Sequence, residues 1–163
     1  MQSTVAVTLT AEVLTNTIQV SVVLTNVAAG HHVPTDFPGR HMILTVMATG
    51  GQGLPLLQRS GPTVPEWGGA QAGLPGKAFA KVLRDVKSGQ SPVVSYWKQT
   101  LIVSDNRIPA FGSDLSRYTF ARPETGGQVQ VTATLIFRRL FQPLADVKGW
   151  NLPDINMAQA RTS

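Results

Sequence analysis

The feature that most constrains the fold is a hydrophobic side chain at every second position in several short segments. The pattern is clearest from Gln128 to Phe137, where Val129, Val131, Ala133, Leu135 and Phe137 share one face. Residues Thr4–Leu14 and Ile18–Thr25 alternate in the same way, with the polar turn Thr15–Thr17 between them. Side chains of a β-strand point alternately to its two faces, so a period of two indicates a strand buried on one side. The first two segments therefore predict a β-hairpin.

The rest of the chain contains more short strand patterns and no long helical period. Further strands are expected at Arg40–Ala48, Val93–Val103, Leu115–Phe120 and Gln128–Phe137, whereas Lys77–Val86 fits either a strand or one helical turn. Several short strands separated by turn signals are typical of a β-sandwich. We therefore predict an all-β fold, an immunoglobulin-like or Greek-key β-sandwich, as a single domain over residues 1–163.

Two segments do not fit the alternating pattern. Leu54–Gly76 carries four prolines, which rule out a continuous helix, and is expected to form a long Gly/Pro-rich loop. The C-terminal tail Pro143–Ala160 is mixed in character and is expected to be irregular, packing on the sandwich with short helical turns.

Composition excludes several classes of protein. With 42% hydrophobic against 14% charged residues, the chain has the balance of a folded domain. The net charge of +5 is dispersed, and Arg138–Arg139 is its only adjacent basic pair, which argues against nucleic-acid binding. No apolar run is long enough for a transmembrane helix. The absence of cysteine excludes disulfides, Cys-ligated zinc, thiolate catalysis and haem attachment through C-x-x-C-H.

All three histidines lie between Asn26 and His41, in the sequence N-V-A-A-G-H-H-V-P-T-D-F-P-G-R-H. If this loop folds back, a mononuclear metal site is conceivable; its ligands would be His31, His32, His41 and Asp36. Copper(II), zinc or iron(II) would suit these ligands. In an extended segment, however, the adjacent His31 and His32 point to opposite faces. The alternative is a stiff corner between two strands, in which the imidazoles bind backbone groups. For His31 a further reading is an axial ligand to a haem in a neighbouring domain.

Other polar and aromatic residues allow both a binding and a structural interpretation. Asp105 and Arg107 can bind a ligand or form an ion pair, and Asp36 can pair with Arg40. Trp67, in the Gly/Pro-rich loop, is expected to be exposed, as a platform for a carbohydrate would require. Tyr96 and Trp97 are expected in a strand, with the ring of one of them in the core. Trp150 is expected to hold the C-terminal tail against the sandwich. No G-x-S-x-G is present, and paired catalytic carboxylates are not expected among nine acidic residues that mostly fall in turns, so no enzymatic activity is predicted.

Several short motifs occur in a characteristic order. They are N-x-x-x-G-H-x-x-P-T (Asn26, Gly30, His31, Pro34, Thr35), then Arg40, then Asp105-x-Arg107-Ile108-Pro109, then Ser116-x-Tyr118-x-Phe120, then Ala133-x-Leu135-x-Phe137-Arg138, and finally Gly149-Trp150 with Asp154-Ile155 and Met157-Ala158. This order resembles the cysteine-free β-rich domain found C-terminal to the haem-binding part of exported multihaem c-type cytochromes and related bacterial proteins. The resemblance covers almost the whole chain.

The resemblance implies a non-catalytic accessory domain, periplasmic or extracellular, that docks or assembles beside a haem-bearing domain of its parent protein or a partner redox protein. Met1 leads directly into the first strand, which fits a domain excised from a longer exported protein. No cofactor is then bound covalently, and haem is expected only in the neighbouring domain or partner. Two alternatives remain: a small metal-binding module using the His31, His32 and His41 loop for a transition metal, and a carbohydrate or surface-ligand binding module.

Overall fold

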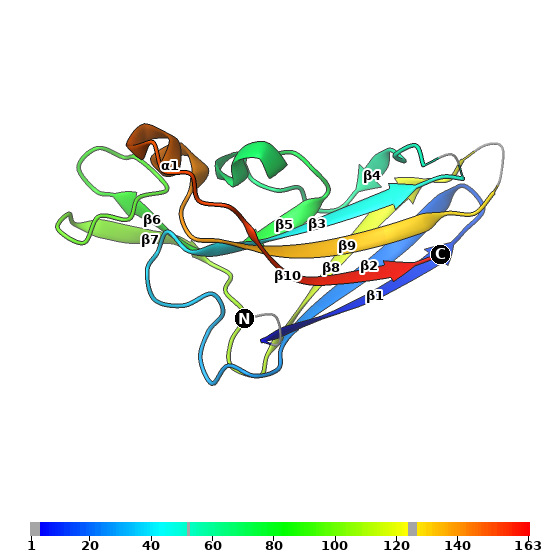
Figure 1. The fold of residues 1–163 in the computed structure, drawn as a ribbon, viewed down its shortest axis with the longest axis horizontal. Helices are drawn as coiled ribbons and strands as arrows, with labels where there is room; N and C mark the ends of the chain where they lie inside the picture. The colour runs from blue at the N-terminus through cyan, green and yellow to red at the C-terminus, as the bar shows by residue number, and fades with distance from the viewer. Residues whose placement is uncertain (1–3, 52, 124–126) are drawn as a thin grey trace.

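The computed structural model describes residues 4–51, 53–123 and 127–163 and contains two facing antiparallel sheets (Figure 1). The first sheet has the order β1-β2-β8-β4, with β1 (Val5–Val13), β2 (Thr17–Asn26), β8 (Ser113–Ala121) and β4 (Gln58–Ser60). The second has the order β10-β9-β3-β5, with β10 (Ile155–Thr162), β9 (Gln130–Arg138), β3 (His41–Thr49) and β5 (Gly76–Phe79). The all-β sandwich predicted from the sequence is confirmed.

Three smaller elements lie outside the two sheets. A two-stranded ribbon of β6 (Lys81–Asp85) and β7 (Thr100–Asp105) extends from one end of the sandwich, beside helix α1 (Gln142–Lys148) (Figure 1). A 3-10 segment, η1 (Glu66–Gln71), packs against α1. Helix α1 ends at Gly149, whose positive φ of 65° allows its amide to bond to carbonyls of the last turn.

The alternating strands supply the core between the sheets. In β2 the buried positions recur at every second residue, including Ile18, Val20, Val22 and Leu24. In β9 the inward face carries Val131, Ala133, Leu135 and Phe137, as the sequence pattern predicts. The predicted hairpin of β1 and β2 is present, with Val13 opposite Ile18. Burial of one face of each strand against the other sheet is what removes this apolar surface from water.

The outer face of the second sheet is also covered near the start of β3. Ile43 packs there with Val64 and Ala78 in a small separate cluster, joined by Trp67. His41 and Arg138 are register partners on β3 and β9, and both are buried. The guanidinium of Arg138 donates to both carboxylate oxygens of Asp154, at 2.7 and 2.8 Å, and to the carbonyl of Gly68 at 2.7 Å. Arg138 thus joins η1 and the C-terminal tail to the sheet.

Several expectations about single elements are wrong. The Leu54–Gly76 segment, expected to be a loop, contains β4 and η1. For Lys77–Val86 the strand alternative is confirmed, although the segment divides between β5 and β6. The strand expected at Val93–Val103 begins only at Thr100; before it, the amide of Val93 bonds to the carbonyl of Leu83 and the carbonyl of Gln99 accepts from Val86, but these bonds do not extend the ladder of β6 and β7. The tail has the expected helical turn in α1, but it ends in an eight-residue strand, β10, that the sequence does not reveal.

Among the residues that the structure describes, no helix is long and apolar enough to cross a membrane.

Candidate functional site

Asn26, the last residue of β2, organises the histidine loop from its base. Its side chain is fully buried, and Nδ2 donates to the carbonyls of His31 and Pro109 at 2.9 and 3.0 Å. Its Oδ1 accepts from the amide of Ala29 at 3.0 Å. The three bonds hold the loop against the segment before β8. Asn26 has this structural role because a side-chain amide at the end of β2 can both donate to and accept from nearby backbone groups.

A second connection holds the middle of the loop. Val33 and Ile108 exchange two backbone hydrogen bonds, of 2.8 and 2.9 Å, and both side chains are buried. Pro34 is buried beside them, whereas Thr35 is exposed. Gly30 is exposed too, and a Cβ built on it meets no atom within 4 Å. The backbone around Gly30 and His31 is therefore held by the hydrogen bonds of Asn26 and of the Val33–Ile108 pair, and not by steric contact at Gly30.

His31 and His32 point to different surroundings. The Nδ1 atom of His31 lies 2.9 Å from the carbonyl oxygen of His32, and the His31 ring lines a cavity. His32 lies close enough to Asp105 for its charge to help lower the pKa of that carboxyl. The two imidazoles thus diverge, as expected for neighbours in extended chain.

His41 lies on the outer face of the second sheet, where its ring is fully buried. It stacks on Phe141 at a centroid distance of 4.9 Å and meets the edge of Trp67 at 5.3 Å. Nδ1 donates to the carbonyl of Gly39 at 2.9 Å, and Nε2 has no hydrogen-bond partner among the described residues. Burial lowers the pKa of His41 to about 4, so its ring is neutral near pH 7.

The structure does not assemble the hypothetical metal site from the histidine loop. Within residues 4–51, 53–123 and 127–163, no group of three or more His, Cys, Asp or Glu side chains is placed to hold a metal ion. The physical reason is that His41 begins β3 and shares the outer face of the sheet with Ile43, whereas His31 lines a cavity on the loop.

The two acidic residues near the loop form ion pairs with arginines. Asp36 Oδ2 lies 3.0 Å from Nη1 of Arg40. Asp105 accepts two hydrogen bonds from Arg107, at 2.6 and 2.7 Å, which holds the pKa of Asp105 below its usual range. Both pairs fit the structural alternative considered for these residues.

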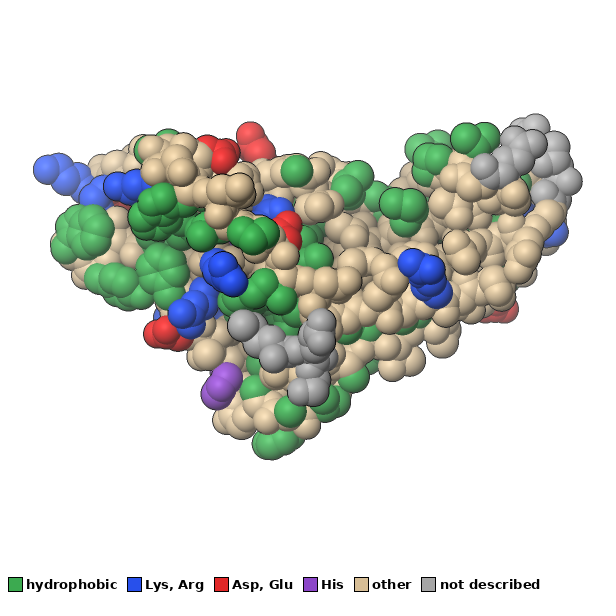
Figure 2. All heavy atoms as spheres, in the orientation of Figure 1, with side chains coloured by type: hydrophobic (Ala, Val, Ile, Leu, Met, Phe, Trp, Pro, Cys, Tyr) green, Lys and Arg blue, Asp and Glu red, His purple; other side chains and the backbone are tan. Residues whose placement is uncertain are grey.

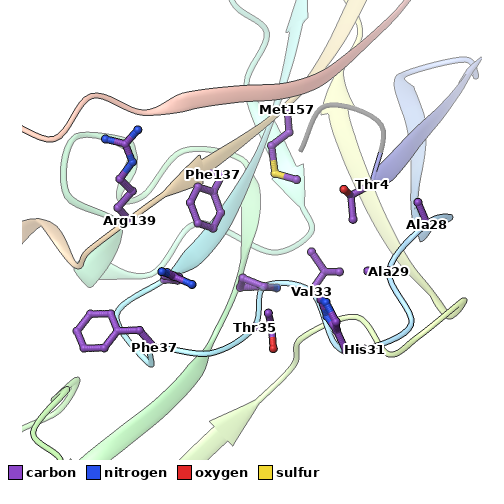
Figure 3. A pocket seen from close by; sticks show the side chains of 12 residues that line it. Thr4, Ala28, Ala29, His31, Val33, Thr35, Phe37, Phe137, Arg139 and Met157 are labelled. Carbon is purple, nitrogen blue, oxygen red and sulfur yellow. The ribbon is translucent and has the colours of Figure 1, made fainter.

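The cavity next to His31 has a volume of about 660 Å³ and lies between the loop and the second sheet (Figure 3). Phe137 of β9 and Met157 of β10 form one wall, and Val33 and Phe37 of the loop form another (Figure 3). The charged residues at the cavity are Arg40 and Arg139; no described Asp or Glu lines it. Because Arg40 is paired with Asp36, Arg139 is the cation that the cavity offers, and the cavity suits a ligand that is largely apolar with a negative group near Arg139.

A second cavity, of about 540 Å³, adjoins the first through the shared residues Phe37 and Arg139. It lies between the 90–98 loop and the end of α1, and its described lining likewise contains no Asp or Glu. Together the two cavities form what we call the apolar–basic surface, whose chief residues are His31, Phe37, Arg40, Tyr96, Trp97, Lys98, Arg139, Leu144, Lys148 and Trp150. Figure 2 shows apolar and basic side chains gathered at the end of the molecule that carries β6, β7 and α1, on the left of the view.

The aromatic residues are placed differently from the sequence-based expectation. Tyr96 and Trp97 are 70% and 81% exposed, and Trp150 is 56% exposed, so none of them enters the core. Trp67, expected to be exposed, packs against His41 and Phe141 instead. The sequence analysis missed a local signal for the exposure of Tyr96 and Trp97: Ser91 and Pro92 interrupt the strand pattern before the pair, and Lys98 follows it.

Comparison with known proteins shows the fold. No protein-family model matches the chain, and no curated protein matches it. Among solved structures, the crystal structure of a penta-haem cytochrome c552 from Thermochromatium tepidum superposes with a TM-score of 0.74 at 20% sequence identity. The superposition covers 99% of this chain and 40% of that cytochrome, so the chain corresponds to less than half the length of the structure it matches. The chain therefore shares its fold with part of a multihaem cytochrome.

Proposed function

We propose that this chain is a non-catalytic accessory β-sandwich domain of an exported multihaem cytochrome-like redox protein, and that it docks beside a haem-bearing domain or partner. One observation carries the proposal: nearly the whole chain superposes on 40% of a penta-haem cytochrome. The order of the sequence motifs supports the same conclusion. The periplasmic or extracellular location and the absence of catalysis by this chain are parts of the proposal.

The apolar–basic surface is the docking face in this proposal. Without cysteine the chain has no C-x-x-C-H for attaching haem, so in this proposal it meets a haem that another domain or partner holds. Exposed Tyr and Trp rings are the side chains that most often dominate binding energy in interfaces. Arg139 and Lys148 lie at the same surface and suit a partner that carries carboxylates, as the haem propionates do, whereas Lys98 is paired with Asp85 at 2.9 Å.

The test is made on the protein in the organism that encodes it. Antibody against the chain should recover material whose spectrum shows c-type haem and whose tryptic peptides contain C-x-x-C-H. Where the haem belongs to a separate partner, the double variant Trp97→Ser/Trp150→Ser should lower the recovered haem at least about tenfold, since large exposed aromatics carry much of the energy of such contacts. Where the C-x-x-C-H peptides belong to the same polypeptide, the variant should instead speed the release of this domain by limited proteolysis. A matched control, Leu54→Ser/Leu57→Ser, removes two residues of similar exposure (63% each) outside the apolar–basic surface. Recovery of the chain free of haem would overturn the proposal.

A carbohydrate-binding function is the second candidate, and the exposed aromatic rings favour it. Tyr96, Trp97 and Trp150 line one groove, whereas the platform first suggested by the sequence, Trp67, is partly buried. If the groove binds glycans, Trp97→Ala should abolish signals on a glycan array. Signals that survive this substitution, or no signals at all, remove the candidate.

A further inference from the structure

We propose that Nε2 of His31 is an axial ligand to the iron of a haem that a neighbouring domain or partner holds. This inference rests on the proposed function and names the contact through which docking reaches the haem. The observations that support it are the tautomer of His31, the fixed backbone that carries its ring, and the cavity that the ring lines.

The hydrogen bond of His31 fixes its tautomer. A backbone carbonyl only accepts hydrogen bonds, so Nδ1, 2.9 Å from the oxygen of His32, carries the proton. In the neutral ring Nε2 then holds a lone pair, and no hydrogen bond to Nε2 is present within the described part of the chain. Histidines that bind metals have this arrangement, in which the second nitrogen donates to a carbonyl or carboxylate and orients the ring.

Asn26 fixes the backbone that carries the ring. Its Nδ2 donates to the carbonyl of His31 itself and to that of Pro109, which joins the loop to the segment leading into β8. The Asn26 side chain is fully buried, and both of its bonds are partly buried. Asn26 is therefore a positioning residue for His31, and its bonds pre-organise the ligand before any partner binds.

A single imidazole suits a haem iron better than a free metal ion. A free ion in a protein needs three or four ligands, and no described group of three lies at the loop. In a haem the porphyrin supplies four nitrogens, so one histidine completes an axial position. The Fe–N bond forms as weakly held axial water leaves, without change in the oxidation state of iron.

The cavity beside His31 matches the rest of such a group. Phe137, Met157 and Phe37 offer apolar contact to a porphyrin edge, and Arg139 suits its propionates, whereas Arg40 is already paired with Asp36. Gly30, the neighbour of His31, is exposed and has open space where a side chain would stand. A flat partner can therefore approach the loop closely.

The probe is an N-acetylated haem octapeptide, a c-type haem with one histidine ligand and water at the other axial position. We expect the chain to convert its ferric haem from high spin to low spin, measured by absorption and electron paramagnetic resonance. Binding should be at least about tenfold tighter than that of N-acetylhistidine methylamide, because the cavity buries part of the porphyrin. His31→Ala should abolish the conversion. The control His32→Ala should keep it within about twofold, since His32 points elsewhere.

A separate variant tests whether Asn26 positions the ring of His31. Asn26→Asp should weaken low-spin formation while circular dichroism shows a folded chain, and free imidazole should form the low-spin haem equally with either variant. Low-spin formation that His31→Ala leaves intact, or affinity no better than that of the free amino acid, would overturn the ligand role. Haem recovered with the chain by antibody and unchanged in spectrum by His31→Ala would leave docking standing and remove only the ligation.

Discussion

At the scale of single residues, the histidine loop shows how one buried side chain can determine where an exposed one lies. Asn26 uses its amide nitrogen and its oxygen together, and the three groups it bonds belong to the backbone of two separate segments. The exposed His31 owes its fixed position to this buried neighbour, so the motif residues Asn26 and His31 act as a unit.

Replacement of Asn26 should therefore cost more than loss of one hydrogen bond. We expect Asn26→Ala to lower the free energy of unfolding by about 2–3 kcal/mol, since one buried and two partly buried backbone groups lose a partner. Urea denaturation measures this change. The control is Asn156→Ala, at an exposed position, where the change should stay within about 0.5 kcal/mol. Equal effects at the two sites would contradict the role of Asn26.

His41 should make stability depend on pH. Its folded-state pKa of about 4 lies below the ordinary 6.5, so between these values the unfolded chain binds a proton that the folded chain does not. The stabilisation is complete above pH 6.5 and is lost as the pH falls to 4, by roughly 3 kcal/mol in total. Urea denaturation at several pH values measures it. His41→Phe, which keeps an aromatic ring on Phe141, should remove this slope; an unchanged slope would assign it to other groups.

At the scale of elements, β5 depends on a close approach to β3 that only glycine permits. A Cβ on Gly76 would overlap the carbonyl oxygen of Leu44 and lie 2.9 Å from Cγ2 of Val64. Because both neighbours belong to a packed face, neither can move without disturbing the pairing of β3 with β5.

Gly76→Ala should thus lower the free energy of unfolding by about 2–4 kcal/mol, as overpacking does in a closed core. The matched control is Gly30→Ala, where the added carbon meets nothing within 4 Å. There the reduced freedom of the unfolded chain should raise stability by about 0.4–1 kcal/mol. Thermal unfolding followed by circular dichroism distinguishes the two, and a tolerated Gly76→Ala would contradict the packing of β5.

At the scale of the whole molecule, the covering of the second sheet depends on Arg138. Its guanidinium joins β9 to Gly68 of η1 and to Asp154 before β10. Both covering segments meet at one buried charge, which is costly unless each donor finds an acceptor. The apolar–basic surface lies at the same end of the molecule, so this junction also supports the proposed docking face.

Removal of the carboxylate partner tests that junction. We expect Asp154→Ala to lower the free energy of unfolding by about 3 kcal/mol, because Arg138 is left buried with a single acceptor. The same change in an exposed pair, Asp36→Ala, should cost less than about 1 kcal/mol. Chemical denaturation compares the two. Equal costs would show that the Arg138 charge is solvated after the substitution.

The sequence by itself determined the strands whose burial alternates. The core-facing residues of β2 and β9 can be recognised in the sequence, because burying one face of a strand produces a hydrophobic residue at every second position. By contrast, β10 has only one fully buried side chain, Met157, and owes its strand conformation to hydrogen bonds with the edge of β9. A local sequence pattern cannot predict such a strand.

The candidate site divides in the same way. The motif around Asn26 and His31 is visible in the sequence, because proline, glycine and histidine between two alternating segments mark a structured loop. Only the tertiary structure decided that His41 lies on another face beside Phe141, that Trp67 is covered, and that Tyr96 and Trp97 are exposed near Trp150. These facts depend on contacts between segments far apart in the chain, and side-chain burial there is set by the partner segment and not by the neighbours in sequence.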